Sequence, residues 1–72
     1  MTKEYYIDIF RTGKKHFWSR IRSSNRKILW VSEVITSKQN VLNPVRKLVA
    51  YLGKKKCEVV YHDELKNKSE VL

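Results

Sequence analysis

The stretch HFWSRIRSSNRKILWVS, residues 16–32, decides the fold class of this chain. Its first seven residues alternate between two sets of side chains, as a strand with two different faces does: Phe17, Ser19 and Ile21 on one face, and His16, Trp18, Arg20 and Arg22 on the other. Residues 23–26 predict a hairpin turn, in which Asn25 is the best candidate for left-handed backbone because Asn tolerates positive φ. Residues 27–32 predict the returning strand.

The flanking segments complete a small α+β domain. Residues 5–11 are rich in Tyr, Ile and Phe and predict a strand before the hairpin, with a turn at residues 12–14. A helix follows the hairpin, and residues 57–62 alternate as a fourth strand. The predicted order is therefore β-β-β-α-β: a three-stranded antiparallel meander, one helix packed on one face, and then a fourth strand.

The helix is predicted from its caps and from one apolar stripe. The stripe has helical spacing and consists of Val41, Val45, Leu48, Val49 and Leu52. Thr36 or Ser37 is expected at the N-cap, with Gln39 or Asn40 placed for a capping box. Gly53 suits the residue after the helix, because glycine adopts left-handed backbone without strain.

Pro44 interrupts this helix pattern, because proline in mid-helix removes a hydrogen bond and clashes with the preceding turn. Either Asn43 caps a helix that begins at Pro44, or the helix is continuous and bent. We expect the continuous, bent helix.

The pairing of the hairpin sets which residues stay uncovered. If Arg22 pairs with Lys27, Leu29 and Val31 lie on the same face as Trp18. The opposite face then meets the helix stripe and carries Phe17, Ile21, Ile28 and Trp30. A sheet covered by one helix has one open side, and this side is expected to be basic and aromatic.

Length and composition limit the class of protein. With 72 residues the chain is expected to form a single domain over residues 1–62, followed by a flexible tail at 63–72 that shows no turn or cap signal. No apolar run approaches the roughly 18 residues of a membrane span, and the N-terminus lacks the apolar region of a signal peptide. The single Cys57 cannot form an internal disulfide, so we expect a cytoplasmic protein, bacterial or viral.

The charge of the chain points to a polyanionic or acidic partner. Sixteen Lys and Arg against seven Asp and Glu give a formal charge of +9, and such a field attracts nucleic acid and acidic protein surfaces. On the open strand face, Arg can bond phosphates and Trp can stack on a base. The candidate partner-binding residues are Lys14, Lys15, Trp18, Arg20, Arg22, Arg26, Lys27, Lys54, Lys55 and Lys56. The three consecutive lysines at the end of this set could equally complement the dipole at the C-terminus of the helix.

Two functions compete at this stage. The first is a non-enzymatic basic protein that contacts nucleic-acid phosphates with low sequence specificity, because the chain has no recognition helix or RNP motif. The second is a protein-interaction module, such as a small regulator or a phage-type inhibitor, that docks on an acidic surface of a host protein such as a nucleic-acid enzyme. Trp18 and Tyr6 would be its anchors. A purely structural homodimer is the alternative to both.

Catalysis, metals and cofactors are not expected. His16 and His62 are far apart in the sequence, and their spacing to Cys57 matches no metal site. The adjacent acids Asp63 and Glu64 are expected to be solvated rather than a carboxylate dyad. The chain has only two glycines and contains no phosphate loop or nucleophile elbow. No small-molecule substrate is expected.

The segment from about residue 6 to residue 49 resembles the YegP-like family, a small bacterial domain of unknown function. That family carries a hairpin of the form F-x-x-R-L-K-A-A-N-G, then V-I-x-x-S-E and Y-S-S-K-A. The matching elements here are residues 17–25, Ile28-Leu29, Ser32-Glu33 and Thr36-Ser37-Lys38, with residues 6–10 similar to the family's first strand. Three family glycines are replaced, by Arg26, Val34 and Pro44.

The resemblance implies a β-meander followed by a helix. Members often carry two such units packed in tandem, which implies that a single unit could form a homodimer. The family brings no enzyme activity or cofactor.

Overall fold

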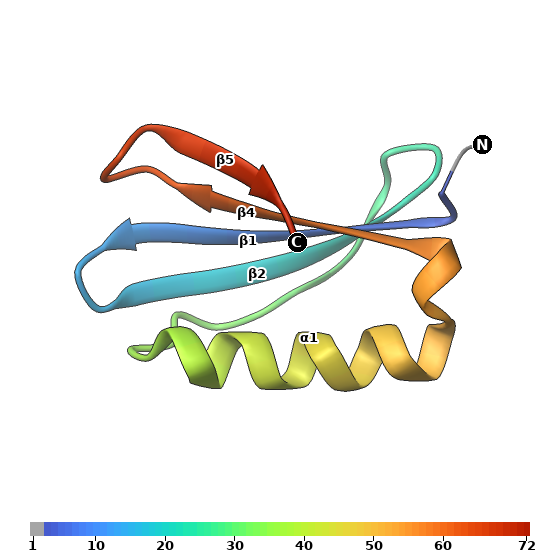
Figure 1. Cartoon of the computed structure of the whole chain (residues 1–72), viewed down its shortest axis with the longest axis horizontal. Coiled ribbons are helices and arrows are strands. Elements are labelled where there is room, and N and C mark those ends of the chain that lie inside the picture. The colour runs from blue at the N-terminus through green and yellow to red at the C-terminus, as the bar shows by residue number, and fades with distance from the viewer. Residues whose placement is uncertain (1–2) are drawn as a thin grey trace.

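The computed structural model describes residues 3–72. The first two residues of the expected domain over residues 1–62 therefore lie outside the described part. Its elements in chain order are β1 (Tyr5–Gly13), β2 (His16–Ser23), β3 (Ile28–Val31), α1 (Lys38–Leu52), the 3₁₀ turn η1 (Lys54–Lys56), β4 (Cys57–Asp63) and β5 (Lys68–Val71). The α+β class and the order meander, helix, strand are confirmed, with a fifth strand added (Figure 1).

The strands form a single mixed sheet in the order β3-β2-β1-β4-β5. Neighbouring strands are antiparallel except β1 and β4, which are parallel. A parallel pair cannot be joined by a tight turn, and here α1 lies in the connection that brings β4 beside β1. The helix covers one face of the sheet, and no helix or strand formed by residues 3–72 covers the other face (Figure 1).

The core lies between α1 and the central strands. Ile7 and Ile9 of β1 are fully buried, and Val41 and Val45 of α1 are buried with them. Leu48, Val49 and Leu52 are partly buried against this core, so the predicted helix stripe is confirmed. Removing each such aliphatic side chain from water contributes roughly 1.5–3 kcal/mol, which is the main driving force available to a chain this short.

The helix begins at Lys38 and is continuous through Pro44. This agrees with the continuous helix that we expect and excludes the alternative in which the helix begins at Pro44. The expected capping box does not form, because the extended N-cap residue Ser37 makes no side-chain capping bond. Gly53 ends the helix as predicted: its φ of 107° favours glycine, and its N–H donates to the Val49 carbonyl at 2.9 Å.

The β2–β3 turn differs from the prediction in its left-handed residue. Arg26, not Asn25, has positive φ, at 68°. The Asn25 side chain is used locally instead, because its Oδ1 accepts the Lys27 N–H at 3.3 Å. The Arg26 N–H donates to the Ser23 carbonyl at 3.0 Å, so the left-handed residue is also the last residue of the hydrogen-bonded turn over residues 23–26.

The pairing of β2 with β3 also differs. Arg22 faces Ile28 rather than Lys27, and Ile21 faces Trp30, so Leu29 occupies an irregularity in the ladder. Trp30 therefore shares the helix side with Ile21, as expected, whereas Ile28 moves to the side of Arg22.

The prediction of a frayed segment after residue 62 is wrong, because Lys68–Val71 form β5, paired with β4. The turn before β5 has two signals that the sequence prediction missed. The Asp63 carboxylate accepts the N–H groups of Leu65 at 3.1 Å and Lys66 at 3.3 Å. Asn67 adopts left-handed backbone with φ of 52°, which Asn tolerates.

Candidate functional site on the open face of the sheet

The uncovered side of the sheet, called the open face below, is built around β1. Because strand side chains alternate, Tyr6, Asp8 and Phe10 lie on the side opposite to the buried Ile7 and Ile9. The antiparallel register sets Arg22 opposite Tyr6, Arg20 opposite Asp8 and Trp18 opposite Phe10. The parallel register adds His62 beside Phe10, and β5 then places Ser69 beside His62.

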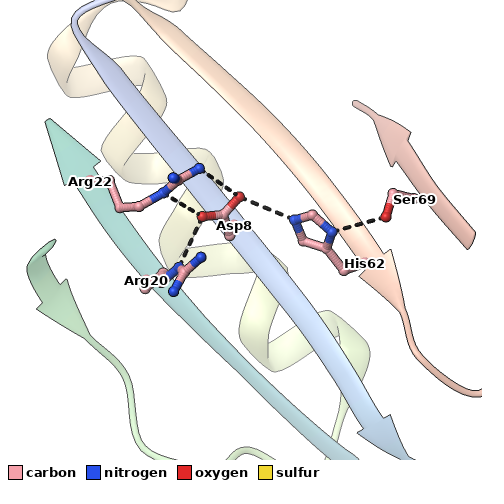
Figure 2. A network of polar contacts seen from close by, with 5 residues as sticks. All are labelled: Asp8, Arg20, Arg22, His62 and Ser69. Carbon is pink, nitrogen blue, oxygen red and sulfur yellow. Dashed lines mark hydrogen bonds and ion pairs between the residues drawn. The ribbon is translucent and has the colours of Figure 1, made fainter. Parts of the chain in front are cut away.

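Asp8 is the centre of a polar network on this face and is only 2% exposed (Figure 2). Arg20 Nε donates to its Oδ2 at 3.0 Å, and Arg22 Nε lies 2.8 Å from the same oxygen. His62 Nε2 lies 3.1 Å from Oδ1, and His62 Nδ1 lies 2.9 Å from Ser69 Oγ. Four strands are thus linked through one carboxylate.

The ionisation of Asp8 follows from these contacts. Burial pushes the pKa of Asp8 upward, because it disfavours the charged form. Hydrogen bonds from His62 and Arg20, together with the charges of Arg22 and Arg20, outweigh burial and hold the pKa of this carboxyl below its ordinary value. Asp8 is therefore a carboxylate at neutral pH and offsets part of the charge of the two arginines.

A row of rings crosses the open face beside this network. Phe10 is stacked between Trp18, at a centroid distance of 4.3 Å, and His62, at 4.7 Å. The Arg20 guanidinium carbon lies 5.0 Å from the Phe10 centroid, and that of Arg22 lies 6.0 Å from the Tyr6 centroid. Both faces of the Phe10 ring are consequently occupied, whereas Trp18 has a stacked partner on one face only among residues 3–72.

The ten predicted site residues do not form one patch. Three of them, Trp18, Arg20 and Arg22, lie together on the open face and are partly exposed. The others are exposed and divide between the two ends of the sheet. Lys14 and Lys15 lie in the β1–β2 turn at one end.

The second lysine and arginine group lies at the opposite end. Ser23 faces Tyr5 in the antiparallel pair, and Cys57 faces Tyr5 in the parallel pair. The residues that follow β2 and the residues that precede β4 therefore share the end of the sheet where β1 begins. These residues are Arg26, Lys27, Lys54, Lys55 and Lys56.

Sequence reasoning missed Asp8, His62 and Ser69. A signal for Asp8 existed, because Asp is depleted in strands and this one stands between two isoleucines in the predicted first strand. The contacts of His62 and Ser69 depend on the parallel β1–β4 pair and on β5, neither of which the sequence prediction contained.

Further findings concern metals, membranes and known proteins. Within residues 3–72 no three His, Cys, Asp or Glu side chains come together as metal ligands, and no helix there has the length and apolar character needed to cross a membrane. Comparisons with protein-family models, with curated proteins and with solved structures find no match. The resemblance to the YegP-like family remains a prediction.

Proposed function

We propose that this protein is a non-enzymatic, cytoplasmic, basic binding protein whose open face contacts nucleic-acid phosphates with low sequence specificity. The observation that supports the proposal is the arrangement of Arg20 and Arg22 around Asp8. Each guanidinium has five N–H donors, and Asp8 takes up only part of them. The two side chains remain 29% and 28% exposed, so donors are left for a ligand.

Asp8 supports binding by ordering the two arginines, although it offsets one of their charges. A free arginine loses side-chain entropy when it grips a phosphate, and a guanidinium already fixed by a buried carboxylate loses less. Two fixed guanidiniums on neighbouring positions of β2 present their free donors on one side of the sheet. The exposed lysines at the two ends of the sheet supply the long-range field.

The aromatic row limits how bases could be read. Phe10 cannot stack on a base, because Trp18 and His62 cover both of its faces. Trp18 offers one remaining ring face, and stacking of a single base there would contribute roughly 1–3 kcal/mol. Phosphate contacts therefore dominate the proposed affinity, which accounts for the low sequence specificity.

The test is fluorescence anisotropy with a labelled single-stranded DNA, an RNA of the same length and a duplex, each over a salt series. We expect binding that weakens steeply as salt rises, because the arginines release counterions on contact. Arg20→Glu with Arg22→Glu should abolish binding. Arg46→Glu with Lys47→Glu is the matched control, because it changes the charge equally at two exposed helix residues.

A third variant guards against unfolding. Arg20→Lys with Arg22→Lys keeps both charges but removes the planar fork, so it should fold and bind more weakly than the wild type. Equal loss in the open-face and helix double variants would reduce the binding to net charge and overturn the role of the open face. Absence of binding to all three nucleic acids, with circular dichroism showing a folded protein, would overturn the proposal itself.

The alternative, a regulator or phage-type inhibitor that docks on an acidic protein surface, has less support from the contacts. Its expected anchors are both engaged within the chain: Trp18 stacks on Phe10, and Tyr6 lies under the Arg22 guanidinium. A pull-down from lysate after nuclease treatment separates the two functions. A stoichiometric protein partner that survives nuclease favours the alternative, and co-purified nucleic acid alone favours phosphate binding.

We assign the Asp8–His62–Ser69 chain a positioning role within this proposal. The order carboxylate, imidazole, hydroxyl is that of a serine hydrolase triad, in which the carboxylate stabilises the protonated imidazole. Here Arg20 and Arg22 already neutralise the carboxylate, which weakens that effect. The network instead ties β2, β1, β4 and β5 together and fixes the two arginines.

A further inference from the structure

A cleft lies at the end of the sheet where β1 and β4 finish. It has a volume of about 730 Å³, which is within the usual range of small-molecule sites. It is lined by the ends of β1 and β4, the start of β2, the first residue of α1, and the turn and second strand of the β4–β5 hairpin. The β4–β5 turn and the start of α1 lie at the same end of the molecule (Figure 1).

The strand registers place the lining side chains on the side of the sheet that α1 covers. Arg11 faces Phe17 of β2 and Asp63 of β4, and Asp63 in turn faces Lys68 of β5. These four side chains therefore form one row across four strands. The row lies on the same side as the buried Ile9, because side chains two residues apart on a strand share a face.

A second row adds a ring and a carboxylate to the cleft. Tyr61 pairs with Ile9 of β1 and with Glu70 of β5, so it lies on the same side as the first row. Lys38, the first residue of α1, reaches this ring from the helix, and its Nζ lies 4.6 Å from the ring centroid. The attraction between an ammonium group and a ring face favours a position of this cation over the cleft.

Cations outnumber carboxylates around the cleft. The charged residues that line it are four cations and two carboxylates, namely Arg11, Lys38, Lys66 and Lys68 against Asp63 and Glu70. The excess is therefore two positive charges. The three lysines are exposed and form no ion pair within residues 3–72, so their ammonium groups are available to a ligand.

The Asp63 carboxylate is already engaged by its own surroundings. Its Oδ2 accepts a hydrogen bond from Arg11 Nη1 at 3.2 Å, and its Oδ1 accepts the N–H groups of Leu65 at 3.1 Å and Lys66 at 3.3 Å. The Arg11 side chain remains 25% exposed, and its Nη2 has no acceptor within the described residues. Arg11 is thus held in place by Asp63 while some of its donors stay free.

We propose that this cleft binds a small organic molecule through a phosphate monoester. Such a group carries a charge of about −1.5 to −2 at neutral pH and has three strong acceptor oxygens. It therefore matches both the excess of two positive charges and the donors of one guanidinium and three ammonium groups. A single carboxylate would neutralise only half of this excess.

The cleft has room for more than the phosphate. One water molecule occupies roughly 30 Å³ in the liquid, so a phosphate group fills only a small part of the volume of about 730 Å³. Phe17 and Tyr61 add aromatic surface to the lining, against which an organic body can pack. A free nucleotide and the phosphorylated end of a nucleic-acid strand both combine a phosphate monoester with such a body.

The test is an NMR titration of the full chain with adenosine 5′-monophosphate, followed at the amide signals of Lys38, Lys66 and Lys68. Ligand concentrations up to about 10 mM detect dissociation constants in the millimolar range. Adenosine lacks the phosphate and should not bind the cleft, and inorganic phosphate lacks the organic body and should bind more weakly than the nucleotide. Because the cleft and the open-face arginines lie on opposite sides of the sheet, failure of one site leaves binding at the other measurable.

Single substitutions locate the site. Lys38→Gln and Lys68→Gln should each raise the dissociation constant of the nucleotide about two- to fivefold, as expected for an exposed charge pair. Lys47→Gln is the matched control, because Lys47 is an exposed lysine of the same helix, nine residues and about 13 Å further along its axis. Its effect should stay below about 1.5-fold.

Glu70→Gln gives a change of the opposite sign. It removes a negative charge from the cleft and should lower the dissociation constant about twofold. Glu58→Gln is its control, because Glu58 faces Tyr6 on the other side of the sheet and should have little effect. Circular dichroism should show that all of these variants are folded.

The possible results separate the site from general attraction to a basic protein. Equal losses for Lys38→Gln and Lys47→Gln would reduce the binding to net charge and overturn the cleft. Absence of shifts at the cleft with the nucleotide would overturn the proposal, as would equal binding of adenosine. Equal affinity for inorganic phosphate would overturn the organic body. A dinucleotide that carries a 5′-phosphate identifies the source: tighter binding than the mononucleotide supports a strand end, and weaker binding supports a free nucleotide.

Discussion

Asp8→Asn is the most informative single substitution, because one buried carboxylate holds three cationic or hydrogen-bonding side chains. The change keeps the shape of the side chain and removes its charge. Hydrogen bonds that involve a charged group contribute roughly 1.5–3 kcal/mol each, and the substitution weakens those of Arg20, Arg22 and His62 together.

The net loss is smaller than the sum of these contacts. The two arginine side chains are 29% and 28% exposed, so water replaces part of what the carboxylate provided, and the amide oxygen still accepts one bond. Removing the desolvation of a buried charge offsets a further part. We therefore expect the free energy of unfolding to fall by about 2–3 kcal/mol, which for a domain of this size lowers Tm by about 10–20 °C.

The assay is urea unfolding followed by tryptophan fluorescence and circular dichroism at neutral pH. Glu58→Gln is the matched control, because Glu58 lies on the same face, opposite Tyr6, and forms no ion pair within residues 3–72. Its cost should stay within about 0.5 kcal/mol. An Asp8→Asn variant as stable as Glu58→Gln would refute the central role given to the network.

The pH dependence gives this prediction a sign. The pKa of Asp8 lies below its ordinary value of 3.8 in the folded protein, so its ionised form contributes stability above about pH 4. That contribution is lost as pH falls through the folded pKa. The part of the stability difference between wild type and Asp8→Asn that comes from the Asp8 charge should therefore shrink below about pH 4. A difference that grows as pH falls below about 4 would contradict the assignment.

Three other predictions concern the fold. Arg26→Gly should raise the free energy of unfolding by about 1 kcal/mol, because Arg26 has left-handed backbone; the same change at Asn67 should gain less, because Asn tolerates that region. Val41→Ala should cost about 2 kcal/mol, since Val41 is 1% exposed, while Tyr51→Ala on the same helix, at 88% exposure, should cost almost nothing. The pKa of Asp63 is also lowered, because the Arg11 hydrogen bond and the turn N–H groups outweigh burial, so Asp63→Asn should lose its destabilising effect in acid. Urea titrations measure all three, and a destabilised Arg26→Gly variant would refute the turn assignment.

Part of the candidate site could be read from alternation alone. The periodicity of residues 16–22 placed Trp18, Arg20 and Arg22 on one strand face, and the structure keeps them there. The pairing partner of Arg22 was one residue off, because the chain absorbs Leu29 in an irregularity that no local pattern announces. The lysines predicted for the same surface lie at opposite ends of the sheet. The sequence shows that these lysines are next to a strand, but the end of the sheet at which they lie depends on how the strands pair.

The sequence by itself determined the fold class of this protein. Alternation of side chains indicated the strands, an apolar stripe with a period of 3.6 residues indicated the helix and its buried side, and Gly53 indicated the end of the helix. These are local properties, because strand and helix periods depend on neighbouring residues only. Only the tertiary structure decided that β4 runs parallel to β1, that the last residues form β5, and that Asp8 meets His62 across that pair. Such contacts join residues that are distant along the chain, so they depend on the relative free energies of whole strand arrangements and leave no periodic trace in the sequence.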